Sequence, residues 1–206
     1  MRLALFDFDG TLTRGDSLLP FLRFHCGALR YAAGLAWASP ALAAYALRVM
    51  RNDVAKEHLL RRMLSGQAIE AVHASGAAFA TQRLPSMLRP DTMARVAEHQ
   101  ARGDTCVLVS ASLDAYLTPW GDAQGFAEVL CSSLETTSDG CVTGRLQGGN
   151  CFGAAKVERV RHWLDGRQPE RVVAYGDSAG DMQMLAFAHD GHWVGAFRPR
   201  KAKPEV

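Results

Sequence analysis

The sequence lacks a strong charge imbalance: its 23 lysines and arginines nearly match its 21 aspartates and glutamates, and the formal net charge is +2. So small a charge gives no electrostatic reason to expect a nucleic-acid partner. The one basic cluster, Arg198 to Lys203, lies at the C-terminal end, where we expect a solvated tail. No internal repeat or low-complexity segment stands out.

The sequence also lacks the cysteine patterns of disulfide-rich or zinc-binding proteins. Its five cysteines are an odd number, and none forms a Cys-x-x-Cys pair. The N-terminus has no long apolar region followed by a cleavage site, so it does not read as a signal peptide. We therefore expect a protein of the reducing cytoplasm.

Long hydrophobic runs are scarce. The uncharged segment Tyr31 to Leu47 spans 17 residues, which is near the lower limit for a membrane-spanning helix. It is rich in alanine and has Pro40 in its middle, which weakens both membrane insertion and helix hydrogen bonding. Three readings stay open: a membrane span, a lipid-touching hairpin that associates the protein peripherally with membranes, and an ordinary packed helical pair. The composition favours the last.

Hydrophobic residues make up 48% and charged residues 21% of the 206-residue chain, which is typical of a globular protein with a sizeable core. A short apolar run over residues 2–7 ends at acidic residues and predicts a buried parallel strand. Residues 17–83 are then predicted to be helical almost throughout, with Ser17 and Asp53 as candidate N-caps. Beyond Pro90 the pattern alternates between helix and strand.

This alternation predicts an α/β fold with a Rossmann-like parallel sheet and helices on both faces. The dipeptide Asp139-Gly140 predicts a hairpin turn. The helical block interrupts the pattern directly after the first strand, so we expect it to sit over the carboxyl ends of the strands. The predicted division is a core of residues 1–15 and 86–206 and a helical cap of residues 16–85. The expected helices beyond Pro90 are 91–101, 113–123, 154–164 and 181–188, and the expected strands are 105–109, 128–132, 171–175 and 192–195.

Two pairs of acidic residues stand where predicted strands end. Asp7 and Asp9 share one face of the first strand, because side chains alternate along a strand. Asp177 and Asp181 follow a later strand and precede a helix. Carboxylates at the end of a buried strand are costly unless they are paired or bind a metal, so both pairs indicate a site.

Two further motifs are weak alone but gain weight beside these acids. Ser110 ends the apolar strand Val107-Leu108-Val109. Lys156 lies in the first turn of a predicted helix, where its charge opposes the helix dipole and suggests a partner anion.

The order and content of these motifs resemble the haloacid dehalogenase superfamily. The helical insertion after the first motif is similar to that of its phosphoserine-phosphatase-like branch, subfamily IB. Within it, residues 16–24 (Asp-Ser-Leu-Leu-Pro-Phe-Leu-Arg-Phe) and 176–181 (Gly-Asp-Ser-Ala-Gly-Asp) look most like the phosphatidylglycerophosphatase C-type subgroup.

This resemblance implies a Mg²⁺-dependent phosphomonoester hydrolase. Asp7 would attack phosphorus to form an aspartyl phosphate, and Asp9 would act as general acid and base. Asp7, the main-chain carbonyl of Asp9, and Asp177 would hold Mg²⁺. Ser110 and Lys156 would bind the phosphoryl group, and Asp181 would orient Lys156 or a metal-bound water.

The substrate is less determined by sequence. The apolar segment that follows Asp16 suits a phospholipid such as phosphatidylglycerophosphate; a small phosphate ester, such as phosphoserine or histidinol phosphate, is the alternative. Asp16 and Ser112 are candidate substrate contacts, although Asp16 could instead cap the next helix. Lys56, Arg61 and Arg62 either reach an anionic end of the substrate or form a solvated helix face.

Two other classes of function remain. A phosphomutase would use the same Asp7 and Asp9 pair and differs in returning an isomerised product. A non-catalytic phosphate-binding protein or receiver domain also groups acids and a lysine on an α/β sheet. Such a domain would need neither Asp9 as a proton donor nor a cap of about seventy residues.

Overall fold

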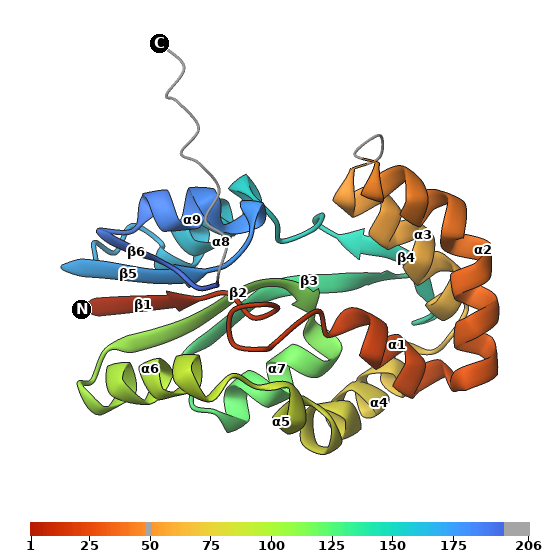
Figure 1. Ribbon diagram of the computed structural model, residues 1–206, viewed down its shortest axis with the longest axis horizontal. Helices are drawn as coiled ribbons and strands as arrows, with labels where there is room; N and C mark the ends of the chain where they lie inside the picture. The colour runs from red at the N-terminus through yellow and green to blue at the C-terminus, as the bar shows by residue number, and fades with distance from the viewer. Residues whose placement is uncertain (48–50, 196–206) are drawn as a thin grey trace, which may run out of the picture.

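The computed structural model describes residues 1–47 and 51–195 of the chain, so the basic segment Arg198 to Lys203 lies outside the described residues. Within the described ranges, six strands form one sheet in the order β4-β3-β2-β1-β5-β6 (Figure 1). The strands are β1 (Arg2–Phe6), β2 (Thr105–Leu113), β3 (Glu128–Thr136), β4 (Val142–Gln147), β5 (Arg171–Gly176) and β6 (Asp190–Trp193). Neighbouring strands are parallel except β3 and β4, which form the predicted hairpin.

Strand β1 is central, with Leu3 opposite Thr105 of β2 and opposite Val172 of β5. Its residues from Leu3 to Phe6 are all buried. A strand with both faces covered needs apolar residues at every position, which explains the uninterrupted apolar run at the start of the sequence.

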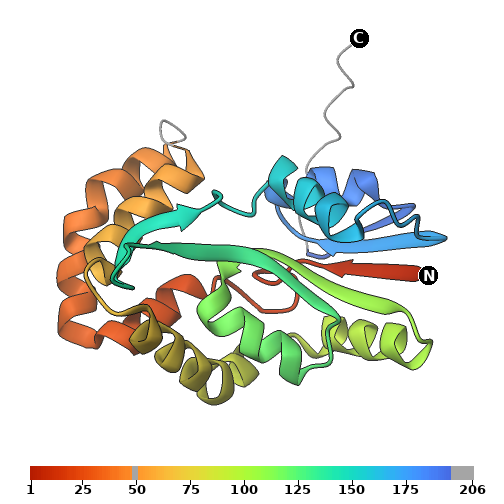
Figure 2. The same ribbon diagram turned by 180° about the vertical axis from the view of Figure 1, so that it is seen from behind.

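Helices cover both faces of the sheet (Figures 1 and 2). Alternate residues of β1 pack toward opposite faces: Leu3 and Leu5 belong to the core under α8 (Ala154–Leu164) and α9 (Met182–Phe187), and Ala4 and Phe6 to the core under α6 (Pro90–Ala101) and α7 (Asp114–Ala123). A single 3₁₀ turn, Ala179–Asp181, precedes α9. The predicted α/β architecture is therefore confirmed.

The remaining helices lie between β1 and α6 in the chain. They are α1 (Leu18–Cys26), α2 (Ala28–Ala46), α3 (Asn52–Leu64), α4 (Ile69–Gln82) and the one-turn α5 (Leu84–Met87). They gather beyond the carboxyl end of β1, with α3 against β4 and α4 against α7 (Figure 1).

The two connections to this helical group run side by side. Thr13 and Leu88 form an isolated antiparallel bridge, and the Arg14 amide donates to the carbonyl of Met87 at 2.9 Å. The chain thus leaves and re-enters the sheet region at one place, close to the predicted boundaries at residues 15 and 86.

Ser17 stands at the predicted N-cap position of α1 but makes no capping bond, and the predicted N-cap Asp53 is wrong. The Ser17 side chain makes no cap bond; its hydroxyl lies 3.0 Å from the Tyr116 hydroxyl and 3.3 Å from that of Ser112. Buried hydroxyl partners from α7 and β2 are available only in the folded protein, and they take precedence over the local cap. Asp53 lies inside the first turn of α3 and pairs with Arg51, because that helix begins at Asn52, two residues before the predicted start at Val54.

The proline in α2 does not break the helix. α2 continues through Pro40, so no hairpin forms there. Pro40 cannot donate to the carbonyl of Ala36, and the Ser39 hydroxyl donates to that carbonyl instead, at 2.8 Å. Among the described residues, no helix combines the length and apolarity that crossing a bilayer requires.

Candidate active site

The loop after β1 places the first acidic pair. The Asp7 amide continues the strand pairing by donating to the carbonyl of Tyr175 at 3.0 Å. The chain then turns, and the carbonyl of Phe8 accepts from the amides of the next residues, including Leu12 at 2.8 Å. Gly10 has φ = +81°, and a Cβ at this position would lie 2.1 Å from the Asp177 carboxylate. Glycine is therefore required for this loop to approach the loop after β5.

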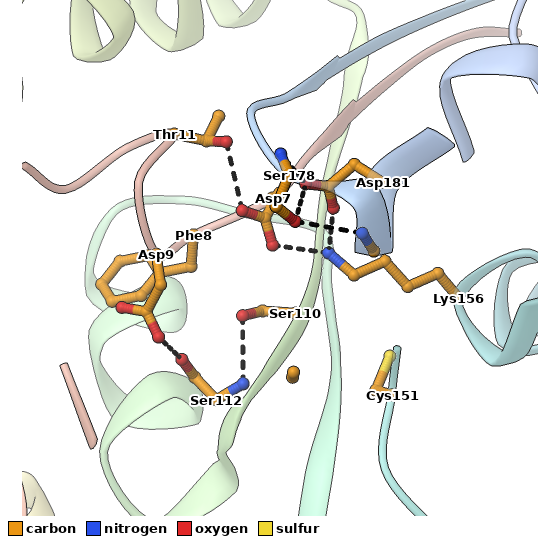
Figure 3. A network of polar contacts seen from close by, with 12 residues as sticks. Asp7, Phe8, Asp9, Thr11, Ser110, Ser112, Cys151, Lys156, Ser178 and Asp181 are labelled. Carbon is orange, nitrogen blue, oxygen red and sulfur yellow. Dashed lines mark hydrogen bonds and ion pairs between the residues drawn. The ribbon is translucent and has the colours of Figure 1, made fainter. Parts of the chain in front are cut away.

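Lys156 of α8 lies between two carboxylates (Figure 3). Its Nζ is 2.5 Å from Asp7 Oδ1 and 2.5 Å from Asp181 Oδ1, and all three side chains are buried. Burial disfavours the charged lysine, but attraction by Asp7 and Asp181 outweighs it and raises the pKa of Lys156. The lysine is therefore a fixed positive charge at the carboxyl edge of the sheet.

The carboxylates outnumber this cation. Oxygens of Asp7, Asp177 and Asp181 lie within 4.8 Å of one another. Burial raises the pKa of Asp7 against the attraction of Lys156, and burial followed by repulsion from Asp181 raises that of Asp177. Three carboxylates beside one lysine leave negative charge uncompensated in a desolvated site, so a cation fits here. Carboxylate oxygens are ligands that hard divalent cations prefer.

Asp181 is less available to a cation than the other two acids. Besides Lys156, it accepts from the Ser178 hydroxyl at 2.8 Å and the Ser178 amide at 2.9 Å, through its second oxygen. These bonds close a capping box at the 3₁₀ turn. Asp7 and Asp177 also share a donor, because the Thr11 hydroxyl lies 3.1 Å from an oxygen of each.

Asp9 points away from the lysine, toward β2 (Figure 3). One carboxylate oxygen accepts from the Ser112 hydroxyl at 2.6 Å and the other from the Ser17 amide at 2.9 Å. Burial, followed by repulsion from Asp16, raises the pKa of Asp9 to about 6. A carboxyl group with a pKa near neutrality can both give and take a proton, which is what a general acid and base requires.

A cavity of about 540 Å³ brings the predicted site residues together. Its lining includes seven predicted catalytic, metal or substrate residues, namely Asp7, Asp9, Asp16, Ser110, Ser112, Lys156 and Asp177. Asp181 is fully buried behind Lys156. Ser110 accepts from the Ser112 amide at 3.1 Å.

The two readings of Asp16 are both represented in the structure. Its Oδ1 accepts from the Leu19 amide at 3.2 Å, which is a capping bond at the start of α1. The same exposed side chain lines the cavity. Ser112 likewise lines the cavity and at the same time donates a hydrogen bond to Asp9.

Of the basic residues Lys56, Arg61 and Arg62 of α3, only Lys56 lines the cavity. Arg61 and Arg62 are exposed, and Arg62 lies over the Trp37 ring. The Lys56 ammonium donates to the carbonyl of Ala111 and to Asn150 Oδ1. It therefore joins α3 to the loops beside the site.

Three hydroxyl residues at the site, Thr11, Ser17 and Ser178, were not predicted as site residues. Thr11 lies within the first motif, where a hydroxyl four residues after Asp7 was a usable signal. The contacts of Ser17 with Asp9 and Tyr116 depend on how α1 meets β2 and α7, and no local pattern predicts them.

The fold and the cluster of acids and lysine at one sheet edge define a Rossmann-like α/β hydrolase. The family model described as haloacid dehalogenase-like hydrolase matches residues 4–186. The chain belongs to this family.

Comparison with curated proteins gives related sequences. Protein CicA of Caulobacter vibrioides is 36% identical over 188 residues, covering 91% of this chain and 83% of CicA. Shorter matches are the histidinol-phosphatase of Neisseria meningitidis (31% identity, 44% of this chain and 43% of the relative) and the phosphoserine phosphatase of Idiomarina loihiensis (31%, 52% and 49%). The chain is thus a hydrolase of the phosphatase type.

Solved structures agree with the fold. A protein of unknown function from Bordetella pertussis Tohama I aligns with a TM-score of 0.78 and 28% identity, covering 91% of this chain and 86% of that one. A substrate-bound phosphoserine phosphatase aligns with a TM-score of 0.64 and 18% identity, covering 91% and 82%. At that identity the second likeness concerns the fold alone.

Proposed function

We propose that the protein is a Mg²⁺-dependent phosphomonoester hydrolase that works through an aspartyl phosphate on Asp7. The observation that carries this proposal is the position of Asp7. It is buried on the wall of the cavity, 2.5 Å from Lys156 and in one acidic cluster with Asp177. No other carboxylate combines access to the cavity with direct contact to a buried cation, among the residues described.

The reaction would proceed in two displacements. An Asp7 oxygen forms a bond to phosphorus while the ester oxygen leaves and takes a proton from Asp9. Asp9 then accepts a proton from water, which attacks phosphorus and regenerates the Asp7 carboxylate. Lys156 offsets charge on Asp7 and the phosphoryl oxygens, and the Ser110 hydroxyl donates to one of those oxygens.

Asp7, the carbonyl of Asp9, and Asp177 would hold Mg²⁺. The ion would supply positive charge that reduces repulsion between Asp7 and an anionic phosphate. Asp181 would keep Lys156 in place. We propose residues 16–85 as the cap and residues 1–15 and 86–206 as the core.

For the substrate, we propose a lipid phosphate such as phosphatidylglycerophosphate. The supporting observation is the apolar cap side of the cavity, formed by Leu18, Leu19, Ala55 and Leu59. Such a substrate would bring the enzyme to the cytoplasmic face of a membrane.

A small amino-bearing ester is the second candidate. Asp16 and Lys56 both line the cavity and carry opposite charges, which suits a zwitterionic leaving group such as that of phosphoserine.

Replacing Asp7 with Asn tests the proposed nucleophile. Phosphate release should fall to the background rate, because an amide is too weak a nucleophile to form the intermediate. The matched variant Asp181→Asn should keep a measurable part of the activity, since Asp181 acts through Lys156. Release by purified Asp7→Asn at the wild-type rate would show that the mechanism is wrong.

A substrate panel tests the leaving group. With Mg²⁺ present, phosphatidylglycerophosphate or another lipid phosphate should be hydrolysed with a higher kcat/KM than phosphoserine, histidinol phosphate or sugar phosphates. Equal or reversed rates would favour the small-molecule candidate, and an isomerised product in place of free phosphate would identify a mutase.

A further inference from the structure

A second cavity adjoins the one at the candidate active site. It has a volume of about 860 Å³ and lies among α1, α2, α4 and α5. Leu19 lines both cavities, so they are neighbours on either side of the first turn of α1. A main-chain hydrogen bond also links residues of the two linings: the amide of Arg14, which lines the active-site cavity, donates to the carbonyl of Met87, which lines the second cavity.

The second cavity is mainly apolar on the inside. The side chains that give it this character are Leu19, Phe24, Ala28, Tyr31, Phe79 and Met87. Tyr31 also lines a third, smaller hollow of about 530 Å³ along α2, with Leu35 and Ala36. We call these two neighbouring hollows, from Leu19 past the shared residue Tyr31 to Leu35, the tail groove.

Positive charge borders the tail groove. Arg23 and Arg83 line its wider part, and neither forms an ion pair within residues 1–47 and 51–195. The sequence from residue 17 to residue 52 contains no aspartate or glutamate. An anionic lipid is complementary to this surface. Its acyl chain would pack against the apolar walls of the groove, and its negative charge would be attracted by the unpaired arginines at the border.

Another face of α2, outside both hollows, is also apolar. On α2 the side chain of Leu29 is 89% exposed and that of Trp37 is 57% exposed. Exposed apolar residues of this size along one helix, beside arginines, are typical of surfaces that meet lipid.

We propose that the tail groove holds the acyl chain of an anionic lipid whose phosphate lies at Asp7. This inference rests on the proposed phosphatase function and specifies the part of the substrate that leaves with the ester oxygen. The chain enters past Leu19, runs beside Phe24 and Tyr31, and approaches the surface along α2.

Chain-length dependence tests the groove directly. We would measure kcat/KM for n-alkyl phosphates of increasing length, each below its critical micelle concentration, with 4-nitrophenyl phosphate as the short reference. For the wild type, kcat/KM should rise about two- to fourfold per added methylene until the groove is filled, as expected for burial of a methylene. A rate independent of chain length would overturn the proposal.

Two tryptophan substitutions on α2 form a matched pair. Ala28 is exposed and lines the wide part of the groove, so Ala28→Trp should fill it and remove most of the chain-length effect while hydrolysis of 4-nitrophenyl phosphate is unchanged. Ala33 is exposed on the same helix but lines neither hollow, so Ala33→Trp should keep the wild-type dependence. Wild-type dependence in Ala28→Trp would contradict the groove.

Binding measurements separate this proposal from the catalytic one. Calorimetric titration with n-alkylphosphonates, which are not hydrolysed, should give the same dependence on chain length and the same response to Ala28→Trp. If no ester is hydrolysed but the affinity for phosphonates rises with chain length, the proposed phosphatase function is wrong and the proposed acyl-chain site is supported. If light scattering finds a wild-type dimer that Ala28→Trp converts to monomer, a second copy of the chain fills the groove and the lipid proposal fails.

Discussion

At the scale of single residues, Lys56 is the side chain whose position is hardest to explain by stability. It is partly buried against the cavity, and it has no carboxylate partner within residues 1–47 and 51–195. Its bonds go to the carbonyl of Ala111 and the amide oxygen of Asn150. Burial lowers the pKa of Lys56 to about 8, against the attraction of Asp9 and Asp16. A desolvated cation that faces a candidate active site is typical of a group kept for binding an anion.

Lys56→Met should therefore separate stability from function. The pKa of Lys56 is about 8 in the folded chain and 10.5 for the free side chain, so the unfolded state binds more protons between these values. The charge penalty in the folded state is full below pH 8 and is gone above pH 10.5. At pH 7 the variant should gain about 1–2 kcal/mol in free energy of unfolding, with lost hydrogen bonds offsetting part of the effect. This gain should shrink as the pH rises.

Urea unfolding of both proteins across this pH range measures the effect, with Arg61→Met on the exposed face of the same helix as control. In parallel, kcat/KM for anionic phosphate esters should fall about 10- to 100-fold in Lys56→Met, the range for losing one charged contact. A loss of stability at pH 7 together with unchanged kcat/KM would mean that Lys56 only joins the cap to the core.

The site residues that could be predicted from the sequence are charged side chains at places where burial makes a charge costly. Asp7 and Asp177 end buried strands, where an acid has no structural reason to stand, and the structure brings both into the cluster. The contact of Ser112 with Asp9 could not be predicted, because it joins segments 103 residues apart in the chain. The Ser17 amide is only eight residues from Asp9, but its bond depends on how the loop between them folds. Local capping rules placed Ser17 correctly at the N-cap of α1 but could not predict that its hydroxyl contacts Ser112 and Tyr116 instead of the helix.

At the scale of helices and strands, two glycines allow the helices inserted between β1 and α6 to approach α7 and β4 closely. A Cβ on Gly76 of α4 would lie 2.0 Å from the carbonyl oxygen of Ala115 in α7. A Cβ on Gly144 of β4 would lie 2.2 Å from the Cα of Arg61 in α3. Both contacts are with backbone atoms, so neither can be relieved by a change of rotamer.

Gly76→Ala should destabilise the protein even though alanine favours helices over glycine by about 1 kcal/mol. The clash with Ala115 requires α4 and α7 to separate, at a cost of about 1–3 kcal/mol. The control is Gly34→Ala in α2, whose Cβ would meet the flexible end of Met63 at 2.8 Å. Thermal unfolding should give a lower Tm for the first variant and an equal or higher Tm for the second. Equal stabilisation of both would contradict the close packing of α4 on α7.

Periodicity and turn residues predicted most elements, including the hairpin at Asp139-Gly140 and the helix 154–164, which the structure matches residue for residue. The continuation of α2 through Pro40 was not predicted. Proline removes one helix hydrogen bond, and here the Ser39 hydroxyl donates to the carbonyl of Ala36 that Pro40 leaves free.

At the scale of the whole molecule, the parallel sheet and the helical insertion line different sides of the cavity. Strands β1, β2 and β5 lie side by side, so their carboxyl ends bring Asp7, Ser110 and Asp177 together although these residues are far apart in the chain. The insertion closes the other side of the cavity with Leu19 and Lys56. In the proposed function the sheet supplies the chemistry and the insertion selects the leaving group.

The central claim is that Asp7 becomes phosphorylated, and acid-quench peptide mapping tests it most directly. Asp9→Asn should form the intermediate from 4-nitrophenyl phosphate, whose leaving group needs no proton, but hydrolyse it slowly because the general base is missing. After incubation with Mg²⁺ and this ester, mass spectrometry should find a hydroxylamine-labile phosphate on the peptide that carries Asp7, and none in the double variant Asp7→Asn, Asp9→Asn. Phosphate on another residue, or turnover with no phosphorylated peptide, would contradict the account.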